Sequence, residues 1–278
     1  MRMILITGAT SGVGRAAALQ LGEQGHHLVL VGRSPDRLAT TAAAVRAAGA
    51  GAVDALECDM GSLDQVRQLA KTVQANYSRI DVLANNAGGF HMTRTETEDG
   101  IEATFAVNHL GGFLLTELLL DLLLHSSPAR ILFTSSVMHF GAHLDFDDLS
   151  LRRGYSPQRA YSASKLANIL YVRDLGRRLE GTGVTANAFH PGAVATNIWD
   201  SAPWLVRPAL SLVKRVFMIS PEEGGRRLTF LATDPEVGAV SGGYFQRDRV
   251  KTPGRAARDD AAARRLRRAC EELTGLAE

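Results

Sequence analysis

The chain has 278 residues, of which 45% are hydrophobic and 22% are charged, with 27 glycines and two cysteines. The apolar fraction excludes intrinsic disorder, and two cysteines cannot build a disulfide framework. The net charge of +2 comes from residues 251–278, because the remainder holds 24 basic and 24 acidic residues. We interpret that segment as a solvated helix and predict no nucleic-acid partner.

Short apolar runs alternate with helical stretches along the whole chain, which indicates repeated strand–helix–strand units. The predicted strands are Met3–Thr7, His27–Gly32, Val53–Glu57, Ile80–Asn85, Arg130–Ser135, Thr185–His190 and Gly243–Gln246. The predicted helices are Gly14–Gln24, Pro35–Ala48, Ser62–Asn76, Gly100–His125, Tyr161–Glu180, Pro221–Ala232 and Ala256–Leu273. The pattern predicts one α/β domain over residues 1–278, with a doubly wound parallel sheet of about seven strands flanked by helices.

The most apolar run, Gly111 to Leu124, is interrupted by polar residues and falls short of the ~20 residues that a membrane span needs. We therefore predict a buried helix there and no integral membrane segment. Strand-like residues begin near Met1, which leaves no room for a signal peptide. These features together favour a cytoplasmic location.

Three glycines follow the first predicted strand, at positions 8, 12 and 14 of the segment TGATSGVG. Gly8 permits a tight turn, Gly12 lets backbone approach a pyrophosphate, and Gly14 lets the next helix pack against the strand. The N-terminus of that helix attracts phosphates through its unpaired N–H groups. We therefore expect the cofactor phosphates on this loop, which also contains Thr10, Ser11 and Val13.

The second predicted strand ends in Gly32-Arg33-Ser34, where binders of NAD place a carboxylate on the ribose 2′-hydroxyl. Here Arg33 stands at that point, and its guanidinium suits a 2′-phosphate. The sequence therefore predicts NADP(H) in preference to NAD(H), against the plainer interpretation that Arg33 is a surface residue.

Tyr161 and Lys165 lie four residues apart on a predicted helix and so share one face. An ammonium beside a phenol stabilises the phenolate, which suits the tyrosine for acid–base work. The pair is common by chance, but polar residues end three neighbouring strands at the same edge of the sheet, where ligands bind in such folds. They are the segments Asn85–Gly88, Ser135-Ser136 and His190-Pro191-Gly192.

Taken in order, the segments TGATSGVG, CDM (58–60), NNAG (85–88), Asn108, SS (135–136), YSASK (161–165) and HPGAVAT (190–196) resemble the short-chain dehydrogenase/reductase family. The resemblance covers residues 1 to about 246 and implies the compact branch with a Rossmann-type fold. The stretch DDLSLRRGYSPQRAYSASKLAN (147–168) further resembles the subgroup of retinol dehydrogenases and protochlorophyllide reductases, in which a segment such as residues 139–159 here separates the serine from the tyrosine.

The resemblance implies roles for individual residues. Ser136 should hold the substrate oxygen, Tyr161 should transfer the proton, Lys165 should bind the nicotinamide ribose and lower the pKa of Tyr161, and Asn108 should support a bridging water. Thr196 should bind the nicotinamide carboxamide and Asp59 should lie near the adenine. The full cofactor set is Gly8, Thr10, Ser11, Gly12, Val13, Gly14, Arg33, Asp59, Met60, Asn86, Ala87, Gly88, Tyr161, Lys165, Pro191, Gly192, Val194 and Thr196.

The expected reaction interconverts an alcohol with a ketone or aldehyde on a small to medium apolar substrate. Besides Ser136, Trp199 and Trp204 in the irregular segment 194–220 are the candidate substrate contacts. No metal is expected, because His139, His143 and the nearby aspartates show no ligand spacing. Alanine- and arginine-rich helices favour a high-GC bacterial source.

Three alternatives stay open. A light-dependent chlorin reductase would need a chlorin pocket that the sequence does not reveal. A cofactor-sensing binding protein would usually lack the tyrosine or the lysine, and both are present. A homodimer could form through the helices that contain residues 113–124 and 161–180.

Overall fold

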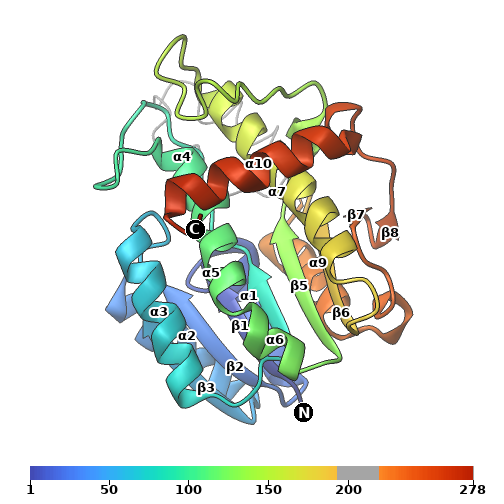
Figure 1. The fold of residues 1–278 in the computed structure, drawn as a ribbon. Helices are drawn as coiled ribbons and strands as arrows, with labels where there is room; N and C mark the ends of the chain where they lie inside the picture. Colours follow the sequence, from blue (N-terminus) through green and yellow to red (C-terminus); the bar gives the residue numbers. More distant parts are fainter. Residues whose placement is uncertain (193–218, 278) are drawn as a thin grey trace.

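The computed structural model describes residues 1–192 and 219–277, and these form an α/β fold around one eight-stranded sheet (Figure 1). The strand order is β3-β2-β1-β4-β5-β6-β7-β8, parallel throughout except for the antiparallel pairing of β8 with β7. The strands are β1 Met3–Thr7, β2 His27–Gly32, β3 Ala52–Glu57, β4 Val82–Asn85, β5 Ala129–Thr134, β6 Val184–His190, β7 Gly243–Gln246 and β8 Arg249–Val250. The predicted fold class is confirmed, with the two-residue β8 added.

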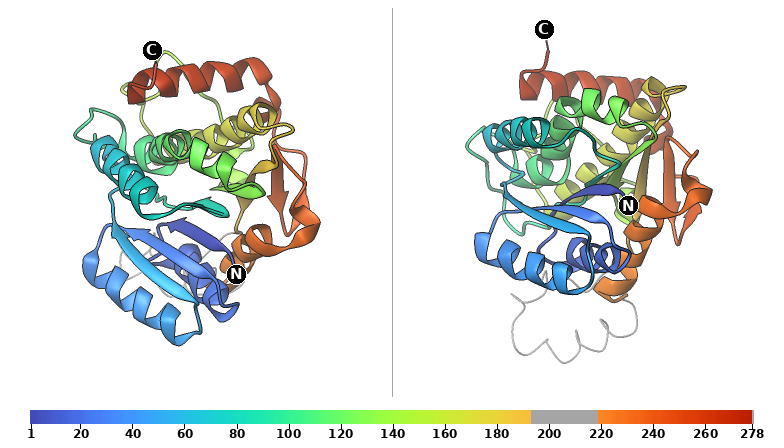
Figure 2. Two further views of the ribbon diagram at one scale, coloured as in Figure 1. Left: turned by 60° about the horizontal axis from the view of Figure 1, so that its bottom comes forward. Right: turned by 90° about the horizontal axis from the view of Figure 1, so that it is seen from below.

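Helices cover both faces of the sheet, as Figure 2 shows. One face packs against α1, α2 and α9, and the other against α3, α5 and α7. The helices are α1 Gly12–Glu23, α2 Pro35–Ala47, α3 Leu63–Asn76, α4 Ala103–Phe105, α5 Gly111–Leu118, α6 Leu120–His125, α7 Pro157–Arg178, α9 Pro221–Thr233 and α10 Asp260–Thr274. Every residue of strands β4 and β6 is buried, as expected for parallel strands that are covered on both faces.

The strand order reverses between β1 and β4, so the connections that leave these two strands turn to opposite sides of the sheet. In folds with this arrangement, ligands bind at the carboxyl ends of the two strands where the order reverses. The described parts of the predicted segments that follow β1, β4, β5 and β6 lie at this edge of the sheet.

The predicted long helix 100–125 is broken into α4, a π-helical turn at Ala106–Leu110, α5 and α6. The Glu102 carboxylate accepts hydrogen bonds from the N–H groups of Thr104 and Phe105 at 2.8 Å each, which starts the helix late. The π turn holds one extra residue per turn and buries Asn108 and His109 together. Apolar periodicity cannot reveal such a turn, because apart from the half-buried Val107 every residue of the turn is buried.

Helix α10 differs from the predicted solvated helix, because it packs across α7 as an outer layer (Figures 1 and 2). It starts at Asp260 because the Asp259 carboxylate caps it, accepting from two backbone N–H groups. Its buried residues are Ala263, Leu266, Cys270 and Thr274. Ion pairs join its polar side to α7, as from Arg267 to Asp174 at 3.1 Å.

Because α10 lies on α7, a second copy could not use that same face of α7 while α10 stays in place. The homodimer through these helices stays a prediction. Among the described residues, no helix is both long and apolar enough to cross a membrane.

We expect Leu266→Ala to lower the free energy of unfolding by about 2–4 kcal/mol, because it removes a fully buried side chain between α10 and α7. Urea denaturation followed by circular dichroism measures the change. A loss below about 0.5 kcal/mol, the size expected of surface substitutions, would contradict the packing of α10 described above.

Candidate active site

The turn after β1 has the close contacts that its glycines predict. Gly8 and Gly12 adopt positive φ angles of 65° and 50°, which side chains disfavour. A Cβ on Gly8 would lie 2.8 Å from the Ala87 Cα, and one on Gly14 would overlap the Gly8 carbonyl oxygen. The loop therefore brings β1, α1 and the end of β4 together more closely than any side chain would allow.

The N-terminus of α1 carries no side-chain cap and no acidic residue in its first turn. Its cap residue is Ser11, whose hydroxyl accepts no hydrogen bond from the helix N–H groups, and Val13 is buried behind it. Thr10 packs on Gly32, where a Cβ would lie 2.8 Å from the Thr10 methyl carbon. The open N–H groups and the helix dipole suit this end of α1 to an anion.

Asn86 ties together the carboxyl ends of three strands. Its Nδ2 donates to the Thr7 carbonyl at 3.0 Å, and its Oδ1 accepts from the Thr134 hydroxyl at 3.2 Å. The Thr7 hydroxyl in turn accepts from the backbone N–H groups of Asn86 and Ala87, both at 3.0 Å. Thr7 was not among the predicted site residues, although its place at the strand end was visible in the sequence.

Arg33 projects from the end of β2 with 68% of its side chain exposed. Its guanidinium lies 3.8 Å from the Asp59 carboxylate, which also accepts from the backbone N–H of Gly61 at 2.9 Å. Met60 is buried beside them. A contact this long and exposed contributes little stability, so the guanidinium is free to take another partner.

Tyr161 and Ser136 meet at this edge. Burial raises the pKa of Tyr161 above its usual value of 10, and a hydrogen bond with Ser136 acts in the opposite direction. The net direction is upward, whereas the spacing to Lys165 predicts a decrease. The phenol is therefore protonated at neutral pH. Phe90, which the sequence did not single out, packs against the Tyr161 ring with centroids 5.5 Å apart.

Lys165 is buried, and its Nζ donates to the Thr134 carbonyl at 3.0 Å. The ammonium lies 5.4 Å from the centroid of the Tyr161 ring. Burial lowers the pKa of Lys165 to about 8, because no carboxylate offsets the loss of water. The lysine is thus charged at neutral pH and is close to its titration range. A Cβ on Gly88 would lie 3.3 Å from this ammonium.

Asn108 holds the loop that follows β4. Its Oδ1 accepts from the Gly89 N–H at 2.7 Å, and its Nδ2 donates to the Gly89 carbonyl and to the Ser164 hydroxyl, both at 3.0 Å. The amide is therefore fully used in fixing this loop beside Lys165. Its predicted part in supporting a water stays a prediction.

Two neighbours of Ser136 support the end of β5. The Ser135 hydroxyl donates to the Lys165 carbonyl at 2.8 Å. His139 lies 2.6 Å from the Ser136 carbonyl through Nδ1 and accepts from the Gly254 N–H at 3.0 Å through Nε2. The sequence did not predict that His139 links Ser136 to Gly254, because Gly254 is 115 residues away.

The remaining predicted residues divide into two groups. Pro191 is buried at the end of β6, and Gly192 follows it with a φ of 105°. The other residues, Val194, Thr196, Trp199 and Trp204, lie outside the described part of the chain.

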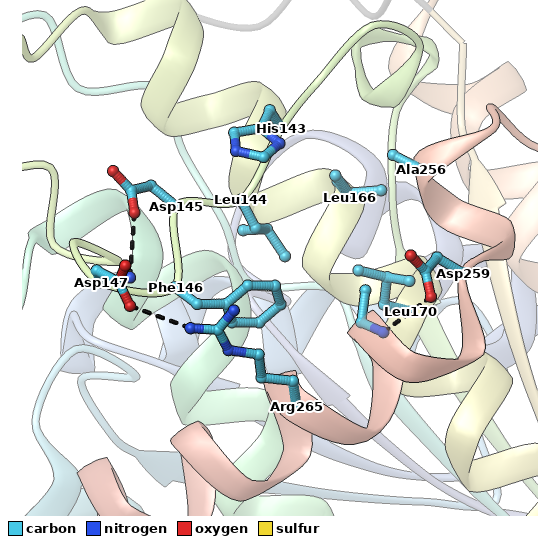
Figure 3. Close-up of a pocket in the computed structure, with 11 residues that line it drawn as sticks. His143, Leu144, Asp145, Phe146, Asp147, Leu166, Leu170, Ala256, Asp259 and Arg265 are labelled. Atoms are coloured by element: carbon cyan, nitrogen blue, oxygen red, sulfur yellow. Dashed lines mark hydrogen bonds and ion pairs between the residues drawn. The ribbon is translucent and has the colours of Figure 1, made fainter.

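A cavity of about 390 Å³ lies elsewhere, between residues 143–147, α7 and α10 (Figure 3). Leu166 and Leu170 contribute its α7 wall, on the opposite face of that helix from Tyr161 and Lys165. Arg265 stacks on Phe146 at 4.5 Å and pairs with a nearby aspartate. The cavity therefore does not belong to the cluster around Tyr161.

The family model for short chain dehydrogenases matches residues 2–203. The chain belongs to this family of oxidoreductases, whose members bind a nicotinamide cofactor. The sequence is 42% identical to retinol dehydrogenase 14 of Mus musculus, over 99% of this chain and 86% of that protein. It is 39% identical to a Streptomyces protein assigned as a daunorubicin C-13 ketoreductase, over 99% of this chain and 93% of the relative.

Solved structures agree with this assignment. An uncharacterised protein from Mycobacterium paratuberculosis superposes with a TM-score of 0.81 and 31% identity, over 99% of this chain and 94% of that one. A short chain dehydrogenase from Burkholderia cenocepacia in complex with NADP superposes with a TM-score of 0.70 and 25% identity, over 88% and 94% of the two chains. The family resemblance inferred from the motifs is confirmed.

Proposed function

We propose that this protein is an NADP(H)-dependent oxidoreductase that interconverts an alcohol with a ketone or aldehyde. The observation that carries the proposal is the cluster of Ser136, Tyr161 and Lys165 at the carboxyl edge of the sheet. A protonated buried phenol beside a charged ammonium is a proton donor suited to the oxygen of a carbonyl group.

The turn after β1 fits a dinucleotide. Because Gly8 and Gly14 have no side chains, the backbone of this turn is exposed to a ligand at close range. The uncapped N-terminus of α1 offers N–H groups to a pyrophosphate. Gly88 follows β4 at the same edge of the sheet, and a Cβ there would lie 3.3 Å from Lys165 Nζ. Gly8, Gly12, Gly14, Asn86 and Gly88 would thus hold the cofactor between its phosphates and its nicotinamide ribose.

Arg33 supports a preference for NADP(H). It stands at the end of β2, where its weak pairing with Asp59 leaves the guanidinium available to a 2′-phosphate. The relative of known structure from Burkholderia was solved with NADP. No carboxylate occupies the Arg33 position to favour an unphosphorylated ribose.

When bound, the nicotinamide supplies or accepts the hydride. The chain's own residues do the rest. In the reducing direction, Ser136 Oγ donates a hydrogen bond to the carbonyl oxygen, and Tyr161 Oη gives its proton to that oxygen. Lys165 stabilises the phenolate that remains, and Asn108 keeps the loop at Gly89 in place beside it.

The substrate class follows from the surroundings of Tyr161. Phe90 packs against the phenol, and Met138, 37% exposed, follows Ser136 on the next turn. An apolar substrate of small to medium size suits these neighbours. The relatives named for retinol and for a daunorubicin ketone point the same way. Substrate contacts by Trp199 and Trp204, a cytoplasmic location and a bacterial source stay predictions.

We expect Tyr161→Phe to lower kcat for carbonyl reduction by about 10²- to 10⁴-fold, because the variant lacks the proton donor. NADPH should bind with nearly unchanged affinity. Oxidation of NADPH is followed at its absorbance band with a panel of apolar aldehydes, ketones and quinones. Tight binding of NADPH without turnover of any panel member by the native chain would favour a cofactor sensor and would sink the proposed activity.

We expect Arg33→Ala to weaken NADPH binding by about tenfold or more, since a charged hydrogen bond to the phosphate is lost, and to leave NADH binding nearly unchanged. Fluorescence titration with both cofactors gives the two Kd values. Arg37→Ala is the matched control, because it removes a guanidinium from the same region, in the first turn of α2. Equal losses for NADPH and NADH in the Arg33 variant would refute the assigned cofactor preference.

We expect kcat for reduction to fall as the pH rises through about 8, the pKa of Lys165. Burial lowers this pKa, so the ammonium is present below about pH 8 and is lost above it, and the phenolate formed in the reaction then loses its stabilising charge. The profile is measured between about pH 6 and about pH 10 with saturating NADPH. A kcat that stays constant across this range would count against the role of Lys165.

A further inference from the structure

A chain of buried polar groups connects α10 with Lys165. Asn168 Oδ1 lies 2.8 Å from His109 Nδ1 in the π turn. On its other side, Asn168 Nδ2 donates to the backbone carbonyls of Asn108 and Thr134, both at 3.0 Å. The Thr134 carbonyl is the same one that accepts from Lys165 Nζ. None of these contacts is needed for the mechanism described above, although each adjoins a residue that it uses.

The donors and acceptors along this row of hydrogen bonds follow from the groups that Asn168 faces. Its Nδ2 faces two backbone carbonyls, which only accept, so its Oδ1 faces His109 and accepts from Nδ1–H. Burial lowers the pKa of His109 to about 4, so its imidazole is neutral and Nε2 carries no proton. Burial raises the pKa of the Cys270 thiol, whose Sγ lies 3.4 Å from His109 Nε2, so the protonated thiol donates to Nε2.

Lys165 and Asn168 lie three residues apart on α7 and so project from the same face of the helix. Among the described residues, the Thr134 carbonyl is the acceptor for the Lys165 ammonium. We infer that Asn168, oriented by His109 and Cys270, is a positioning residue that holds this carbonyl where it receives the ammonium. The inference deepens the proposed function and rests on it for its consequence in catalysis.

The expected effect on Lys165 follows from its surroundings. The titratable groups that face it in the described structure are Tyr161 on its own helix and His109 from the π turn, and both are neutral at neutral pH. The peptide that contains the Thr134 carbonyl is also held by the Ser135 N–H, which donates to the Phe189 carbonyl at 2.7 Å. Without Asn168, the carbonyl keeps that support but loses the side chain that aims it at the buried ammonium. The hydrogen bond to the charged form is then less well aligned, and the pKa of Lys165 should fall further below about 8.

The test is a titration of the Lys165 ammonium by NMR in protein with ¹⁵N-labelled lysine. The chain has four lysines, Lys71, Lys165, Lys214 and Lys251, and the Lys165→Met variant identifies the signal. We expect Asn168→Leu to lower the pKa of Lys165 by about one unit relative to the native chain. Asn168→Ser, which is smaller and also lacks the bridging amide, should lower it in the same direction and serves where the leucine variant does not fold.

Two control variants separate positioning from general destabilisation. Cys270→Ser keeps a donor to His109 Nε2 and should leave the pKa of Lys165 unchanged. Leu266→Ala removes a buried side chain from α10 without touching the polar chain, and it should lower the melting temperature without moving the titration. A folded Asn168 variant with the native titration of Lys165, or a shift of equal size in Leu266→Ala, would overturn the inference.

Kinetics provide the second measurement. The alkaline decline of kcat should move to lower pH in the Asn168 variants, by the same amount as the NMR titration, with KM for the carbonyl substrate nearly unchanged. The NMR measurement needs no substrate. Absence of turnover in the native chain would therefore contradict the proposed function alone, whereas an unchanged titration would contradict the positioning role alone.

Discussion

The burial of one positive charge, the ammonium of Lys165, constrains the rest of the site. No carboxylate contributes to the pKa of Lys165, which burial lowers to about 8. A backbone carbonyl of β5 accepts a hydrogen bond from the ammonium. Removing an ammonium from water is unfavourable unless its hydrogen bonds are replaced. The Thr134 carbonyl at the end of β5 supplies such a hydrogen bond to Lys165. Asn168 on α7 donates to the same carbonyl and to the Asn108 carbonyl in the π turn, so that three elements meet beside the ammonium.

This constraint explains why residues far apart in sequence meet at the carboxyl edge of the sheet. Asn86 fixes the ends of β1, β4 and β5 relative to one another, and Asn108 fixes the loop after β4. Ser135 donates to the Lys165 carbonyl and so joins α7 to the end of β5. These hydrogen bonds form without a cofactor and orient the side chains of the cluster, which is what a site that acts by orienting groups requires.

Much of the fold and of the candidate site could be predicted from the sequence. Strands such as Met3–Thr7 were predicted with the bounds that the structure shows, because a short apolar run that ends at Gly8 has few other interpretations. Tyr161, Lys165 and Ser136 were named because their spacing and their place at strand ends carry chemical meaning. The exposed position of Arg33 likewise follows from its place directly after β2.

The contacts that support those residues could not be predicted. Four of the five residues of the π turn are buried, so apolar periodicity gives no sign of the extra residue that turns Asn108 and His109 inward. The hydrogen bond between Cys270 and His109 joins residues that are 161 positions apart. The many arginines of α10 suggested a solvated helix, although four of its residues are buried. Such contacts depend on tertiary packing, which no local pattern records.

The most direct measurement is a crystal structure of the protein with NADP⁺ bound. We expect the pyrophosphate at the N-terminus of α1, the 2′-phosphate beside the Arg33 guanidinium, and the nicotinamide ribose within hydrogen-bond distance of Lys165 Nζ and Tyr161 Oη. A cofactor whose nicotinamide lies away from Tyr161 and Lys165 would contradict the assignment of this edge of the sheet as the active site.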